Sequence, residues 1–280
     1  MKQLTTLTTS ILFSTLVALS LSASSNHTDS TYISYITCAD SAIAKNNWEL
    51  AEQSLIEAMR SNPSNPTNVM LLSNLALIQF QQGKDSIALA SINEANIIAP
   101  NSITILSNRA RILKSMGKID DAYSDYSMIL SIDSSLIEPR YMHGIIALSK
   151  SDFTTAQDDF LTLEQVAPNS PITFEALATF YFYTHQFEKA IPYYSKLLKY
   201  ETSIEALINR ATCYLTTNQL SEASADISEG LKVAPNNGEF YLLRTWLNRL
   251  FYRFDDAKKD AQKAIELGIP INRVNAALQQ

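Results

Sequence analysis

Apolar residues recur along this chain with the spacing of paired amphipathic helices. The clearest example is residues 173–201, where two apolar stripes of helical spacing flank the short segment Thr184-His185-Gln186. The first stripe consists of Phe174, Leu177, Ala178 and Tyr181, and the second of Phe187, Ala190, Tyr194, Leu197 and Leu198. The pattern predicts two helices joined by a turn, which is a helical hairpin.

The same hairpin pattern repeats along almost the whole chain, with alanine at one fixed position. The repeated residues are Ala51, Ala88, Ala122, Ala156, Ala190, Ala223 and Ala257, separated by steps of 37, 34, 34, 34, 33 and 34. A second position, in the first helix of each hairpin, holds Ala39, Ala76, Ala110, Gly144, Ala178, Ala211 and Thr245. An ordinary helical bundle has no fixed period, so the steps indicate a repeat array.

A period near 34 residues with two helices per period resembles the tetratricopeptide repeat (TPR) family. The resemblance implies an all-α fold, a right-handed superhelical solenoid of about seven hairpins. The expected array spans residues 32–271, with units at about 32–65, 69–102, 103–136, 137–170, 171–204, 204–237 and 238–271. Arg140 departs from the pattern, because it occupies a slot that usually holds a large apolar side chain. The tail, residues 272–280, is expected to cap the last hydrophobic face.

The first 23 residues have the pattern of a secretory signal peptide. Lys2 provides the positive start, an apolar stretch follows, and small residues end at Ala23. An uncleaved membrane anchor is the alternative. Residues 24–31 are polar and are expected to form a spacer. We therefore expect an exported protein, periplasmic, envelope-associated or secreted, from a bacterium, with membrane contact only if the signal stays uncleaved.

Composition and motifs argue against catalysis and nucleic-acid binding. The chain carries a net charge of −6, and its 22 basic residues are scattered, so no row of phosphates would be neutralised. No catalytic or cofactor motif is present, and the three histidines fall in different parts of the repeat, which predicts neither metal nor cofactor. Glu175 and Glu188 are interpreted as solvated helix faces.

One pairing rule follows from comparing the units with each other. Four units carry a basic or imidazole side chain in the first helix and, sixteen residues later, an aspartate in the second. We expect a charge-assisted hydrogen bond between the two helices of each of these units. The pairs are Arg109 with Asp125, His143 with Asp159, Arg210 with Asp226, and Arg244 with Asp260.

The resemblance also implies that the first helices line a concave groove. The groove residues expected from it are Tyr141, Ile145, Phe182, Tyr183, Thr212, Trp246 and Arg249, together with Ile36, Leu77, Arg111 and Leu215. The function implied is a non-enzymatic scaffold that binds a segment of a partner protein. The alternative is a module that stacks its aromatic side chains on a glycan or peptide ligand. The aromatic residues could instead pack between neighbouring units.

Overall fold

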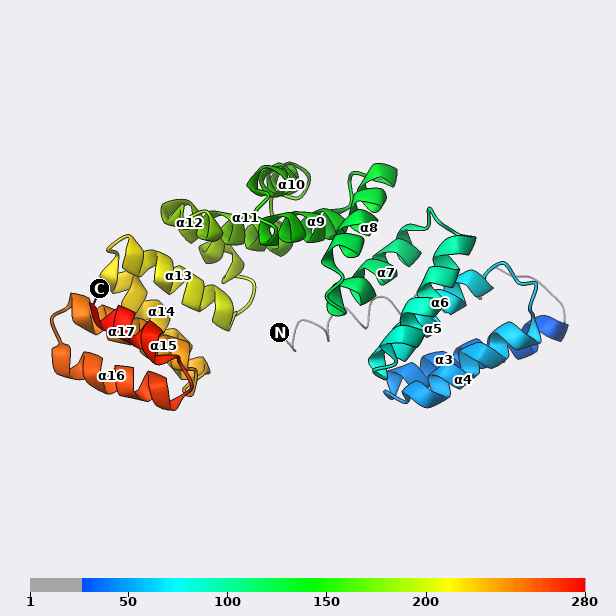
Figure 1. Ribbon diagram of the computed structural model, residues 1–280, viewed down its shortest axis with the longest axis horizontal. Coiled ribbons are helices and arrows are strands. Elements are labelled where there is room, and N and C mark those ends of the chain that lie inside the picture. Colours follow the sequence, from blue (N-terminus) through cyan, green and yellow to red (C-terminus); the bar gives the residue numbers. More distant parts are fainter. Residues whose placement is uncertain (1–26, 280) are drawn as a thin grey trace. The chain divides into compact units, whose positions relative to one another are not determined.

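The computed structural model describes residues 27–279, and these residues form helices and turns without any β-strand (Figure 1). The expected signal peptide and the first part of the expected spacer lie outside the described residues. The chain divides into two compact halves, Met1–Pro139 and Arg140–Gln280.

Successive antiparallel helices form hairpins in both halves. The N-terminal half contains α3 (His27–Ala44), α4 (Trp48–Ser61), α5 (Asn68–Gln81), α6 (Asp85–Ile98), α7 (Ile103–Ser115) and α8 (Ile119–Ile132). The boundary between the halves falls in the first turn of α9 (Ile137–Ser149). The C-terminal half continues with α10 (Phe153–Val166), α11 (Pro171–Tyr183), α12 (Phe187–Leu197), α13 (Ile204–Thr216), α14 (Leu220–Val233), α15 (Gly238–Leu250), α16 (Phe254–Glu266) and α17 (Ile271–Gln279).

The alanine repeat marks where the helices of a hairpin pack against each other. All seven repeated alanines have an exposed fraction of 0%, as do Ala39, Ala76, Ala110, Ala178 and Ala211 in the second small slot. At Gly144, an added Cβ would overlap the ring of Phe160. A larger side chain in either slot would push the helices apart, which is why the sequence keeps these slots small.

The turn inside each hairpin uses one left-handed residue at the same slot. Gly83 and Gly117 have φ values of 74° and 76°. The same conformation is adopted by a non-glycine residue in the other five hairpins, at Asn46, Ser151, His185, Asn218 and Tyr252. Because the left-handed region is costly for bulky residues, the repeat geometry imposes this conformation even where the local sequence disfavours it.

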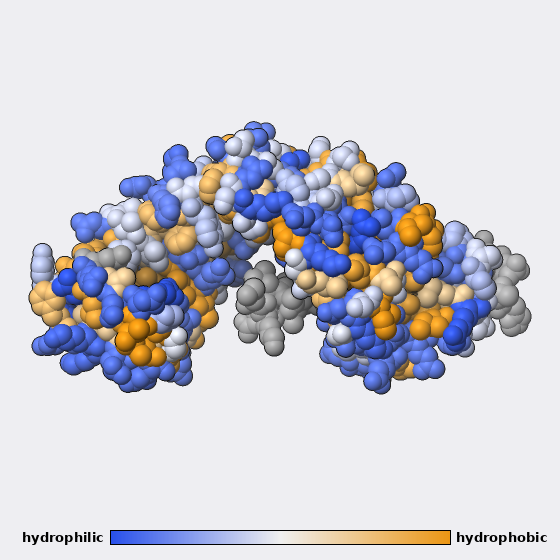
Figure 2. All heavy atoms as spheres, in the orientation of Figure 1, coloured by the Kyte–Doolittle hydropathy of each residue, from blue (hydrophilic) through white to orange (hydrophobic). Residues whose placement is uncertain are grey.

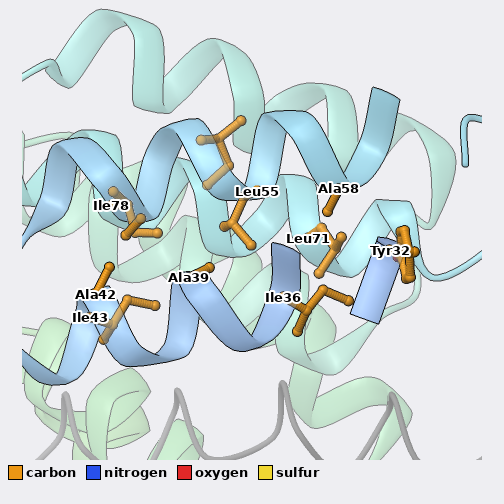
Figure 3. Close-up of a cluster of buried hydrophobic side chains, with 11 residues drawn as sticks. Tyr32, Ile36, Ala39, Ala42, Ile43, Leu55, Ala58, Leu71 and Ile78 are labelled. Atoms are coloured by element: carbon orange, nitrogen blue, oxygen red, sulfur yellow. The ribbon is translucent and has the colours of Figure 1, made fainter. Parts of the chain in front are cut away.

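The first hairpin packs onto α5 through a continuous apolar core (Figure 3). Ile36 and Ile43 of α3 point toward Leu55 of α4 and toward Leu71 and Ile78 of α5. The side chains that close one end of this core include Tyr32, whose hydroxyl donates to Asn68 Oδ1 at 3.0 Å. α3 begins at His27, so residues 27–31 of the expected spacer are helical.

The C-terminal tail forms α17 and covers the last hairpin. Val274 and Ala277 are buried in a cluster with Leu242, Ala261 and Ala264. Arg273 also donates to both carboxylate oxygens of Glu239, at 2.6 and 2.8 Å. This helix shields apolar side chains that a further repeat would otherwise cover.

Candidate functional site

Three arginine–aspartate pairs bridge the two helices of their hairpins in one common geometry. Arg109 donates from Nε to Asp125 Oδ2 at 2.8 Å and from Nη2 to Oδ1 at 2.5 Å. This planar two-point contact is the strongest form of the interaction. The same contact, at 2.8 and 2.6 Å in each case, joins Arg210 to Asp226 and Arg244 to Asp260.

In the fourth hairpin, Asp159 contacts both His143 and Arg140, the residue that departs from the repeat pattern. His143 Nδ1 lies 2.6 Å from Asp159 Oδ2, and Arg140 Nη1 donates to Asp159 Oδ1 at 2.9 Å. Arg140 precedes His143 by one helical turn, so both side chains leave α9 on the same face. Sequence reasoning missed this role of Arg140, although its spacing from His143 carried the signal.

The three arginine–aspartate pairs are structural devices, because each aspartate is buried while part of its arginine reaches solvent. Asp125 is 3% exposed, and Asp226 is 4% exposed. The hydrogen bonds that Arg109 donates to Asp125 raise the pKa of Arg109. A cavity of about 220 Å³ adjoins the Arg109 pair and is lined by polar side chains that include Lys118, Asp121 and Ser124. The arginine is therefore stabilised as a cation at the edge of the hairpin core.

The second and fifth hairpins have leucine at this slot, Leu75 and Leu177, and form other contacts between or beyond their helices. In the second hairpin, Ser91 Oγ donates to Gln79 Oε1 at 2.8 Å. In the fifth, Tyr193 stacks on Tyr181 with ring centroids 5.8 Å apart, and its hydroxyl donates to Glu164 Oε1 at 2.6 Å. Glu164 lies on α10, so this bond ties two successive hairpins together.

Three of the expected groove residues belong to the hydrophobic core instead. Ile36 is 4% exposed, Leu77 is 6% exposed and Leu215 is 3% exposed. Each packs within a cluster of buried apolar side chains. Their assignment to a binding surface was wrong. Helical spacing predicts which side chains share a face only to within about one residue, and a residue on the inner face is only one position away from a residue in the core.

The expected aromatic anchors differ in how much of each ring is free. Tyr183 is 62% exposed, and its ring meets Phe182 edge-on with centroids 5.9 Å apart. Phe182 also contacts the rings of Phe187 and Tyr194, so it packs within the fifth hairpin. Trp246 is half-buried against the core of the last hairpins. Tyr183 is therefore the anchor with the most accessible ring.

The remaining expected groove residues are half-buried and partly engaged. Thr212 Oγ1 donates to the carbonyl oxygen of Ile208, one turn earlier in α13. The guanidinium of Arg249 lies 5.1 Å from the centre of the Phe254 ring. Ile145 is half-buried on α9. The contacts of Thr212 and Arg249 hold these two side chains in place, and all three residues remain partly exposed.

Tyr141 and Glu175 form a hydrogen-bonded pair on two successive hairpins of the C-terminal half. The Tyr141 hydroxyl is hydrogen-bonded to Glu175. Burial raises the pKa of Glu175, the bond to Tyr141 lowers it, and the charges of Glu205 and Glu201 raise it further. Glu175 is half-buried, so its interpretation as a solvated face was wrong. Its position, one repeat after Tyr141, was the signal that could have placed it.

On the one face that Figure 2 draws, the apolar surface is not continuous. On the face drawn in Figure 2, hydrophobic side chains form separate groups within a mostly hydrophilic surface. No described helix combines the length and apolarity needed to cross a membrane. Within residues 27–279, no three His, Cys, Asp or Glu side chains gather as a metal site would require. Recognition by this surface would depend on individual aromatic and charged side chains.

Comparison with known proteins places this fold in the tetratricopeptide repeat class. Residues 204–237 match the tetratricopeptide repeat family model. A tetratricopeptide repeat protein from Parabacteroides merdae ATCC 43184 is 26% identical, with a TM-score of 0.67 over 89% of this chain and 98% of that one. The predicted all-α fold of about seven hairpins is thereby confirmed, and such a fold indicates a scaffold for protein–protein interaction.

Two further similarities are weaker in sequence. YrrB, described as a TPR protein with an unusual peptide-binding site, is 19% identical, with a TM-score of 0.56 over 68% of this chain and 98% of that one. The Protein CTR9 homolog of Arabidopsis thaliana is 25% identical over 230 residues, which cover 74% of this chain and 21% of that protein. This chain thus spans about a fifth of the length of its plant relative.

Proposed function

We propose that this protein is a non-enzymatic scaffold, exported to the cell envelope, that binds a segment of a partner protein on the inner faces of its first helices. The observation that supports the proposal most directly is the exposed Tyr183, which lies beside Phe182 at the end of α11. Large exposed aromatic rings next to packed ones are typical anchors of protein interfaces. The similarity to YrrB, a TPR protein with a peptide-binding site, supports the same interpretation.

The expected partner is an extended or helical segment rather than a large flat surface. Tyr141, Tyr183 and Arg249 stand on α9, α11 and α15, so contacts would be distributed along successive hairpins of one half. A segment of a partner can follow such a series of side chains. Repeat proteins use extended surfaces of this kind, because each hairpin adds a few contacts to the next.

Pull-down from envelope extract tests the scaffold function. The variant Tyr183→Ala removes an exposed ring, so the fold should be kept while capture of a specific partner falls. Tyr252→Ala is the matched control, because Tyr252 is 80% exposed and lies in the turn between α15 and α16. Equal capture by the Tyr183→Ala protein and the unmodified protein would contradict the proposed binding surface.

The ligand-binding alternative has its own test. Calorimetric titration with cell-wall fragments and oligosaccharides should give no heat of binding if the groove serves a protein partner. A saturable signal that is lost in Tyr183→Ala would instead favour the glycan or peptide ligand.

Export is tested at the N-terminus. If residues 1–23 act as a cleaved signal, mass spectrometry of the protein from a bacterial envelope fraction should find a mature chain that starts near Ser24. A full-length chain in the cytoplasmic fraction would contradict export.

A further inference from the structure

The turn between α15 and α16 differs from the turns of the other six hairpins. We name its residues, Phe251, Tyr252, Arg253 and Phe254, the aromatic turn, and its three rings are 38%, 80% and 46% exposed. At the same four slots, each of the other hairpins carries at most one phenylalanine, tyrosine or tryptophan. Tyr252 also has a φ of 59°, which is costly for a bulky side chain. Core packing does not explain exposed rings on a strained turn, so these residues are candidates for contact with another molecule.

The local charge changes sign at this turn. Between residues 249 and 259, four basic residues face two acidic ones, which gives a net charge of +2. The same stretch of each of the other six hairpins has a net charge of 0 or −1, and the whole chain has −6. Of the seven hairpin turns, this one is therefore suited to attract an anionic surface. The charged residues of the stretch are Arg249, Arg253, Asp255, Asp256, Lys258 and Lys259.

Two arginines lie against the exposed rings and keep their charge available. The guanidinium of Arg253 is 5.0 Å from the centre of the Phe251 ring, and that of Arg249 is 5.1 Å from the centre of the Phe254 ring. Tyr252 meets Phe254 edge-on, with centroids 6.2 Å apart. Among the described residues, neither arginine forms an ion pair, and the Nε atom of Arg249 is buried without a hydrogen-bond partner. The turn thus combines a cluster of rings with two cations that have no counter-charge.

The backbone of the aromatic turn is prepared for an apolar environment. The N–H groups of Phe251, Tyr252 and Arg253 donate to carbonyl oxygens of α15, at 3.0, 2.9 and 2.8 Å. A backbone donor that is already bonded costs little to move out of water, which is the condition for entering a lipid layer. Aromatic rings are favoured at the level of lipid headgroups, and arginines beside them can reach toward the phosphates. A protein partner would need a pocket shaped for three rings, whereas a bilayer interface adapts to them.

We propose that the aromatic turn inserts into the surface of a bilayer that contains anionic phospholipids. The rings of Phe251, Tyr252 and Phe254 lie at the level of the headgroups, and Arg249 and Arg253 bind lipid phosphates. This contact is peripheral and needs no helix that spans the membrane. It goes beyond the proposed scaffold function and does not depend on it, because the turn is separate from the exposed ring of Tyr183 on α11.

Co-sedimentation of the full chain with vesicles tests the proposal. Vesicles of phosphatidylglycerol and phosphatidylethanolamine should bind the protein more tightly than vesicles of phosphatidylcholine. The triple variant Phe251→Thr/Tyr252→Asn/Arg253→Gln installs the turn of the sixth hairpin, residues 217–219, whose middle residue has the same left-handed conformation. It should weaken binding to the anionic vesicles about tenfold or more, because two rings and one cation are lost. Its melting temperature should be equal to or above that of the unmodified protein, because the strain at Tyr252 is relieved.

Two further variants separate the contributions of charge and of exposed apolar surface. Arg253→Gln keeps the rings, and should weaken binding to the anionic vesicles about fivefold while leaving binding to phosphatidylcholine nearly unchanged. The matched control Ile97→Ser/Ile98→Ser removes two apolar side chains of α6 that are 80% and 60% exposed. It should change binding less than about twofold, because no unpaired arginine accompanies these residues.

A dye placed in the turn distinguishes this contact from binding through another part of the chain. The environment-sensitive dye nitrobenzoxadiazole can be attached at Tyr252→Cys in a Cys38→Ser background, because Cys213 is fully buried. On anionic vesicles, its emission should rise and shift to shorter wavelengths. The same dye at Ile97→Cys should not respond, even though all these proteins carry the same N-terminal residues.

Three outcomes would overturn the proposal. The first is a protein that binds neither kind of vesicle. The second is vesicle binding that the triple variant retains in full, or a dye at residue 252 that does not respond, since the contact would then lie elsewhere. The third is a triple variant that loses capture of a protein from detergent extract while the dye reports no entry into lipid, which would assign the aromatic turn to a protein partner.

Discussion

The pair formed by Arg109 and Asp125 allows a quantitative test of how these hairpins are held together. Asp125 is 3% exposed and accepts two hydrogen bonds from one guanidinium. Substituting Asp125→Ala removes both bonds and leaves Arg109 without its partner. The side chain of Arg109 is 22% exposed, so part of its charge can be solvated again after the substitution.

The expected cost follows from these two facts. Breaking a fully buried pair typically costs about 3–5 kcal/mol, and partial solvation of Arg109 should bring Asp125→Ala to about 2–3 kcal/mol. The reverse substitution, Arg109→Ala, strands a carboxylate that cannot reach water, so we expect about 3–5 kcal/mol. The control Asp85→Ala removes an exposed charge from the first residue of α6 and should cost less than about 1 kcal/mol.

Urea denaturation followed by far-ultraviolet circular dichroism measures these differences in the free energy of unfolding. The double variant Arg109→Leu/Asp125→Ser installs the residues of the second hairpin, Leu75 and Ser91, at the same two slots. It should be more stable than Arg109→Ala, because no unpaired charge remains buried. Equal midpoints for Asp125→Ala and Asp85→Ala would refute the reasoning, since a buried two-point contact would then be worth no more than an exposed charge.

Three further predictions concern backbone strain, packing and pH. Tyr252→Gly should stabilise the protein by about 0.5–1 kcal/mol, because Tyr252 has a φ of 59° that glycine adopts freely, and an unchanged unfolding midpoint would argue against strain at this turn. Gly230→Ala should destabilise by about 1–3 kcal/mol despite the better helix propensity of alanine, because its Cβ would overlap the fully buried Phe240 ring; a rise in the melting temperature would contradict this. Burial raises the pKa of Asp40 to about 6, and neither of its carboxylate oxygens has a hydrogen-bond partner. The ionised form is thus disfavoured in the fold, and the penalty grows as the pH rises from about 4 to about 6 and then stays constant. Asp40→Asn should therefore raise the stability by about 1 kcal/mol near pH 7.5, after allowance for solvent screening, and by little near pH 4 in thermal melts; a pH-independent effect would contradict the assignment.

The repeat architecture could be predicted because the same spacing of apolar and small residues recurs several times along the chain. The alanine at the slot of Ala190 predicted the helix crossings, and all seven copies are fully buried. The position of the turn could also be predicted from the repeat. The left-handed conformation of His185 and Tyr252 results from the geometry of the hairpin and not from the preference of those residues. Comparison between the repeats also predicted which arginine contacts which aspartate. Residues at equivalent positions of each repeat take equivalent places in the hairpin, whatever surrounds that hairpin.

The all-helical fold, the hairpin period and the residues that meet within one hairpin could be predicted from the amino-acid sequence, because these depend on contacts that are local or that repeat at a fixed interval. Which residues next to the core are exposed depends on how the helices pack in three dimensions, as the burial of Leu77 and Leu215 shows. The same holds for the charges of Glu201 and Glu205, which raise the pKa of Glu175, since that effect depends on how successive hairpins stack. Electrostatic effects of this kind arise from distances between units and from lost solvation, and neither quantity is written in the spacing of residues along the chain.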